Sequence, residues 1–131
     1  MDILQLESIV TTQLKVRVPR ILDGAYPTLS FTTEITDKTP SFPNVYVHEM
    51  DSSEVGNSIP NDMIHAVRDT IQFDVTTNTK KADAHIVAMA VINAMKVLRY
   101  SVVTMPVYIK TNNLHRYTFR MRRTVANGDV F

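Results

Sequence analysis

The chain has 131 residues, a net charge of +1 and no cysteine, and 44% of its residues are hydrophobic. These values predict one globular domain, and they exclude a disulfide scaffold, a thiol nucleophile and a cysteine-based zinc site. A net charge this close to zero does not indicate a type of partner, so nucleic-acid or membrane binding has to be argued from local clusters of charge. We expect no secretory signal and no membrane span, because no apolar run approaches the roughly 18 residues that a span needs.

The first half of the chain predicts one helix followed by strands. Apolar residues at near-helical spacing predict a helix over residues 2–15, which Pro19 is expected to stop. Alternating polar and apolar residues predict strands over 29–36 and 44–50. The polar stretch at about 51–61 predicts an exposed loop, either a passive excursion or an arm that becomes ordered against a neighbouring subunit.

The second half predicts a strand, a long helix and two final strands, at residues 63–77, Lys81–Leu98, Ser101–Lys110 and Leu114–Val125. The helix is expected to be capped by Asn78 or Thr79, and its alanines allow close approach to a sheet. Its larger apolar residues are expected to pack, namely Ile86, Met89, Ile92 and Val97. The element order predicts a single α+β domain over 1–131, with two helices on one face of a mixed, mostly antiparallel β-sheet.

No catalytic, metal or cofactor motif is present in the sequence. The four histidines, His48, His65, His85 and His115, form no H-x-x-x-H pair. Three glycines cannot be arranged into a phosphate-binding loop. We therefore expect no enzyme activity, no cofactor and no metal. A small enzyme remains an alternative only if the fold brings a histidine and an aspartate together into a site.

The last predicted strand is the most basic segment of the chain. Alternation predicts that Arg116, Arg120 and Arg122 project from one face with Thr118. The opposite face is expected to carry Tyr117, Phe119, Met121 and Arg123. Such a strand is typical either of a nucleic-acid or other anionic surface or of a subunit interface at which arginines pair with carboxylates. The near-zero net charge favours the interface.

Three stretches of the sequence, in order, carry a family resemblance. They are PNVYVHEMDSSEVG at Pro43–Gly56, DTIQFDVTTNTKKADAHIVAMAVINAM at Asp69–Met95, and MPVYIKTNNLHRYTFRMRRTV at Met105–Val125. In this pattern the chain resembles the tail terminator and head-to-tail joining proteins of long-tailed bacteriophages. Together with the predicted N-terminal helix, the resemblance covers most of the chain.

The resemblance implies a structural virion protein without enzymatic activity. Such proteins form rings, commonly hexamers, that bind the last ring of the tail tube, stop its polymerisation and face the head connector. The implied partners are further copies of the chain, the tail-tube protein and a connector or stopper protein, with DNA passing through the ring lumen without sequence-specific binding. The implied location is the tail or neck of the virion, assembled in the host cytoplasm, with no membrane contact.

Two alternatives stay open: a head-closure or head–tail adaptor subunit, and a nucleic-acid-binding module that uses the basic strand at 114–125. The candidate interface residues include both basic and acidic side chains, because each subunit of a ring needs two complementary surfaces. They are Arg116, Arg120, Arg122 and Arg123, with Glu49, Asp51 and Glu54 as acidic partners.

Overall fold

The computed structural model describes residues 6–34, 38–54 and 66–126, with the backbone alone at 51–54, 66 and 126. This part of the chain forms two helices and five strands in the expected order. They are α1 (Leu6–Ile21), β1 (Ser30–Thr32), β2 (Asn44–Glu54), β3 (Ala66–Thr77), α2 (Lys81–Val97), β4 (Ser101–Thr111) and β5 (Leu114–Ala126).

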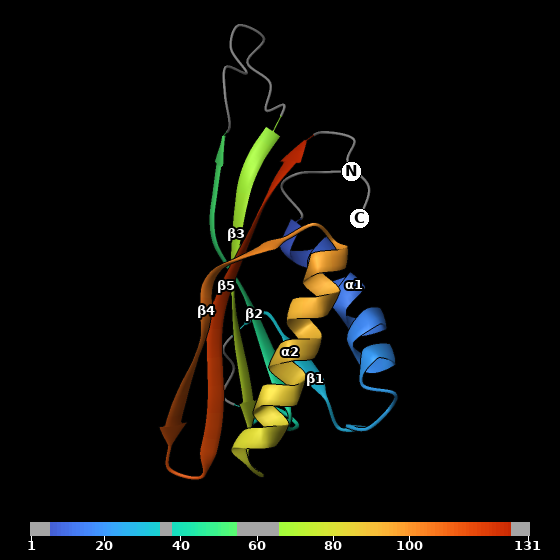
Figure 1. Cartoon of the computed structure of the whole chain (residues 1–131), viewed down its shortest axis with the longest axis vertical. Helices are drawn as coiled ribbons and strands as arrows, with labels where there is room; N and C mark the ends of the chain where they lie inside the picture. The colour runs from blue at the N-terminus through green and yellow to red at the C-terminus, as the bar shows by residue number, and fades with distance from the viewer. Residues whose placement is uncertain (1–5, 35–37, 55–65, 127–131) are drawn as a thin grey trace, which may run out of the picture.

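The strands form one mixed sheet in the order β1-β2-β3-β5-β4. Only β1 and β2 are parallel, and the other three neighbouring pairs are antiparallel. Both helices lie on the same face of this sheet, where α2 packs against β3, β4 and β5, and α1 packs against α2 and β2 (Figure 1). The predicted α+β class is confirmed. Neither described helix is long and apolar enough to cross a membrane.

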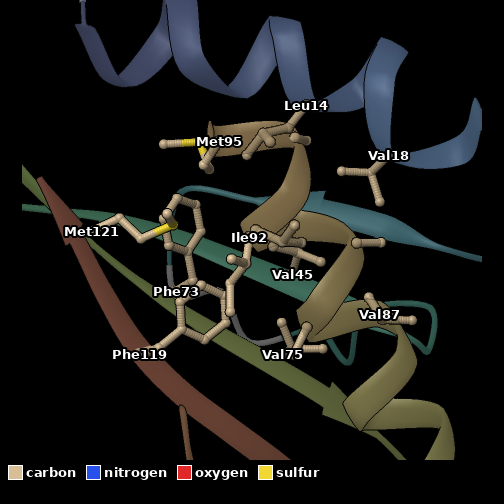
Figure 2. Close-up of a cluster of buried hydrophobic side chains, with 14 of the residues drawn as sticks. Leu14, Val18, Val45, Phe73, Val75, Val87, Ile92, Met95, Phe119 and Met121 are labelled. Carbon is tan, nitrogen blue, oxygen red and sulfur yellow. The ribbon is translucent and has the colours of Figure 1, made fainter. Parts of the chain in front are cut away.

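The core lies between the two helices and the three central strands. Alternation places Ile71, Phe73 and Val75 of β3 on the helix side, where all three are fully buried. Phe119 of β5 stacks on Phe73 with ring centroids 5.2 Å apart. Figure 2 shows both rings beneath α2, which contributes Val87, Ile92 and Met95. Small residues on α2 allow the close approach, since Ala84, Ala88, Ala90 and Ala94 are all buried.

The first helix runs past the residue that was expected to stop it. α1 includes Pro19 and ends at Ile21. Pro19 removes one donor to the carbonyl of Lys15, but both residues are exposed, so water can reach the carbonyl. The helix then ends in a Schellman motif, in which Gly24 donates to the Pro19 carbonyl and Asp23 to that of Arg20. Asp23 takes the left-handed conformation that this ending requires, with φ of 53°.

Other boundaries also differ from the sequence predictions. The strand expected at 29–36 is only Ser30–Thr32, and residues 35–37 lie outside the described residues. β2 extends to Glu54, so the first part of the predicted polar loop is strand, while 55–65 are not described. α2 begins at Lys81, as predicted, but its N-cap is Lys80, which provides no side-chain cap, instead of Asn78 or Thr79.

Three apolar residues of α2 that were expected to pack are exposed. Ile86, Met89 and Val97 are between 40 and 61% exposed. The face that α2 buries passes through its alanines and through Val87, Val91 and Met95 instead. Helical periodicity allowed both faces, and the small residues decided which one fits against the sheet.

The Phe73–Phe119 pair gives a test of this core. Phe119→Ala removes a fully buried ring and leaves a cavity, so the free energy of unfolding should fall by about 3–5 kcal/mol. The matched control is Ile86→Ala on the exposed side of α2, for which we expect a change within about 0.5 kcal/mol. Urea unfolding followed by circular dichroism measures both, and equal losses would contradict the assignment of the core.

Candidate functional site

The face of the sheet opposite the helices carries a stripe of arginines. Arg116, Arg120 and Arg122 of β5 project there, as alternation predicted, because Tyr117, Phe119 and Met121 are buried on the other side. β3 adds Arg68, whose register partner Thr124 shares the same face. We call these four residues the basic face. Sequence analysis missed Arg68, although its even spacing from Gln72 and Asp74 within β3 was a usable signal.

The basic face is held in place by hydrogen bonds across the strands. Arg120 Nε donates to Gln72 Oε1 at 3.1 Å. Thr118 donates to Asp74 Oδ1 at 2.8 Å, and Asp74 is the one carboxylate among the described side chains of β3 and β5 on this side. The arginines therefore outnumber the acidic groups near them, and this face is suited to an anionic partner.

A groove of about 620 Å³ lies at one end of the same face. Side chains from β2, β3, β5 and the segment before β2 line it, among them Lys38, Phe42, Tyr46, Arg116 and the carboxylate of Asp74. Aromatic and cationic groups together suit a partner surface that combines carboxylates with apolar side chains.

Arg123 is placed differently from the other three predicted arginines. It is only 7% exposed and faces the helices, where its Nη1 donates to the Leu98 carbonyl at the end of α2, at 3.0 Å. Asp69 lies opposite it in the ladder, is fully buried and accepts a 2.5 Å hydrogen bond from the Tyr100 hydroxyl. Arg123 is thus an interior residue that lies opposite a buried carboxylate in the ladder and satisfies a helix-end carbonyl.

The three predicted acidic partners are also placed by the structure. Glu49 belongs to the interior side of β2, where its carboxylate oxygens are buried and its backbone N–H donates to Glu7 Oε2 at 3.3 Å. The β2 backbone carries Asp51 opposite Thr70 and Glu54 opposite Val67. The side chains of Asp51 and Glu54 lie outside the described part. Interface roles for all seven predicted residues stay predictions, and Arg123 and Glu49 are inside the subunit where the sequence analysis expected surface.

The three histidines in the described part of the chain do not converge. His48 and His85 are exposed on β2 and α2, and His115 pairs with the Tyr108 hydroxyl at 2.6 Å. His65 lies outside the described residues. Within the described residues, no group of three potential ligands is placed to hold a metal ion.

A second surface, missed by sequence analysis, lies along β4 at the edge of the sheet. Met105 is 71% exposed there, and three other apolar side chains are 43 to 53% exposed, namely Val103, Val107 and Ile109. A groove of about 720 Å³ runs between this strand and α2, lined by residues that include Met89, Ile92, Met105 and Lys96. The signal was the sequence SVVTMPVYI, which has apolar residues at consecutive positions and so places them on both faces.

Comparisons with known proteins give a structural likeness. The sequence matches no protein-family model and no curated protein. Its fold is similar to a chain in the solved structure titled "Virion of native gene transfer agent (GTA) particle", with a TM-score of 0.53 and 14% sequence identity. The likeness covers 93% of this chain and 95% of the other, so the two share a fold over nearly their whole length.

The buried Tyr100–Asp69 contact generates a pH-dependence test. Burial, and next the negative charge of Asp69, raise the pKa of Tyr100 far above the ordinary 10.0. The unfolded chain releases this proton above pH 10 and the folded state keeps it. The stability that Tyr100 contributes is therefore present below pH 10 and is lost above it, by about 1.4 kcal/mol per pH unit.

The variant Tyr100→Phe separates the contribution of the Tyr100 hydroxyl to stability from that of the other titratable groups. At pH 8 it should lower the free energy of unfolding by about 1.5–3 kcal/mol, because a hydrogen bond to a charged group is removed. Between pH 10 and 11 its free energy of unfolding should fall less steeply than that of the wild type. Denaturant unfolding at each pH measures both quantities, and equal slopes would contradict this account.

Proposed function

We propose that this chain is a structural subunit of a phage-like virion. The observation that carries the proposal is the fold likeness, over nearly the full length of both chains, to a chain of a gene transfer agent virion. The pattern resemblance of the sequence to tail terminator and head-to-tail joining proteins supports the same setting independently.

Within the virion, we infer a ring, expected to be a hexamer, at the head-proximal end of the tail. The ring would stop tail-tube polymerisation and present a surface to the head connector. Two exposed surfaces of different chemistry support this role, because a ring component must contact both neighbours in the ring and partners above and below it. The basic face and the apolar β4 edge provide such surfaces on one small subunit. A structural rather than catalytic role belongs to the same proposal.

A second candidate function rests on the basic face alone. Four arginines, accompanied by one carboxylate among the described side chains of β3 and β5, also suit the phosphate backbone of nucleic acid. The two candidate functions predict different binding behaviour. A DNA-binding module should bind duplex with a log affinity that falls by about 0.9 per phosphate contact for each decade of salt. A ring component should associate with itself and with tail tubes.

The deciding experiment measures mass by light scattering at low and high salt, followed by mixing with polymerising tail-tube protein. The expected result is a hexamer in solution, or a monomer that forms rings on tube ends and shortens the tubes seen by electron microscopy. A strict monomer that leaves tube length unchanged would overturn the proposal. If that monomer also binds DNA with strong salt dependence, the nucleic-acid module replaces it.

Charge reversal on the basic face tests whether that face contacts a partner. Arg120→Glu should weaken ring assembly or tube binding by at least about tenfold, because it places an anion in a surface suited to anionic partners. Lys15→Glu is the matched control, since it makes the same change of charge at an exposed site on α1. Tube-length measurements with both variants decide the matter. If Arg120→Glu shortens tubes as well as the control does, the basic face is not an interface.

A further inference from the structure

β4 has the composition of an interior strand but lies at the edge of the sheet. Val107 and Ile109 are opposite Thr118 and Arg116 in the ladder, so they share the face away from the helices. Met105 lines the groove on the helix side. A strand that is apolar on both faces is typical of strands covered on both sides by protein. β4 is eleven residues long, and on its outer side no strand of the described part pairs with it.

The charges of the chain are separated along the sequence, although they nearly cancel in total. Residues 22–65 contain seven acidic residues and one lysine. Residues 80–126 contain nine arginines and lysines and a single acidic residue, Asp83, which is occupied by hydrogen bonds from Tyr26 and Thr79. The net charges of the two segments are therefore opposite in sign.

The topology turns this separation into two unlike edges. The acidic segment builds β1 and β2 at one edge of the sheet, with Asp23 and Glu34 exposed. The basic segment builds α2, β5 and β4 at the other, with Lys96 and Lys110 exposed beside the apolar side chains. Figure 1 shows β4 on the far side of β5 from β2. Two β4 edges brought together would set like charges against each other, whereas unlike edges attract.

We propose that the β4 edge and its groove against α2 bind the acidic β1–β2 side of a second copy of this chain, in a head-to-tail arrangement. The inference rests on the proposed function and names the surfaces by which subunits meet. A contact between two different surfaces repeats from copy to copy and closes into a ring when the rotation permits. The occupant of the apolar groove is therefore another subunit, selected by opposite charge.

Two variants, each blocked at one edge, test the direction of the contact. Val107→Glu puts an acid into the β4 edge. The double variant Glu34→Lys with Asp51→Lys reverses charge on the other side. Each alone should associate at least about 30-fold more weakly than the wild type, the size expected for a central interface residue. Mixed in equal amounts, they should form a one-to-one dimer and nothing larger, because each variant retains one intact edge. Sedimentation velocity measures all three samples.

The control for folding is Val16→Glu, the same substitution at a valine of similar exposure on α1, 50% against 53% for Val107. It should associate like the wild type, and circular dichroism checks that all variants are folded. Self-association of the double variant at wild-type strength, or a mixture that stays monomeric, would overturn the head-to-tail contact in favour of another surface. So would a wild-type chain that stays monomeric at every concentration.

These outcomes are independent of tube capping. If rings form and shorten tail tubes while Val107→Glu assembles normally, the virion role stands and the proposed edge contact fails. If the mixture dimerises as expected but the wild type has no effect on tubes, the edge contact stands and the terminator role fails.

Discussion

Close packing of α2 against the sheet is the contact on which the rest of the subunit depends. α2 touches β3, β4 and β5 on one side and α1 on the other, and α1 also contacts β2 directly. The alanines of α2 make its close packing possible, because larger side chains at Ala84 or Ala88 would hold the helix away from Phe73 and Phe119. With both helices committed to one face of the sheet, the opposite face and the β4 edge are left for other contacts.

β5 shows how one strand serves the core and the surface at once. Its inward side chains include Phe119 and Met121, which are fully buried, and its outward ones include the exposed Arg120 and Arg122. Arg123 is a charged residue inside the core, and the hydrogen bond that it donates to the carbonyl at the end of α2 offsets part of the cost of its burial. The end of the helix and the middle of the sheet are thereby fixed to each other by polar contacts as well as by packing.

Local patterns predicted the order of elements and the two faces of β5, because both follow from periodicity within a few residues. They could not predict what depends on distant segments. Alternation placed Arg123 on the same side as Phe119, but its partners come from α2 and β3, and an unpaired arginine belongs on the surface. Pro19 was judged by its local effect on a helix, while the motif formed by Asp23 and Gly24 lets the helix end two residues later. Ile86 and Met89 satisfied helical spacing, and only the packing of the alanines excluded them from the core.

Total charge conceals the property of this chain on which the proposed contact between subunits rests. The value of +1 is a sum over segments of opposite sign, and the strand order keeps those segments at opposite edges instead of mixing them. An edge strand that is apolar on both faces would ordinarily pair with copies of itself. Cations beside β4, at Lys96 and Lys110, oppose such self-pairing and favour the acidic edge of the next subunit. In the proposed head-to-tail contact a single chain contains both halves of a directional interface, and directionality is what distinguishes a closed ring from a symmetric dimer.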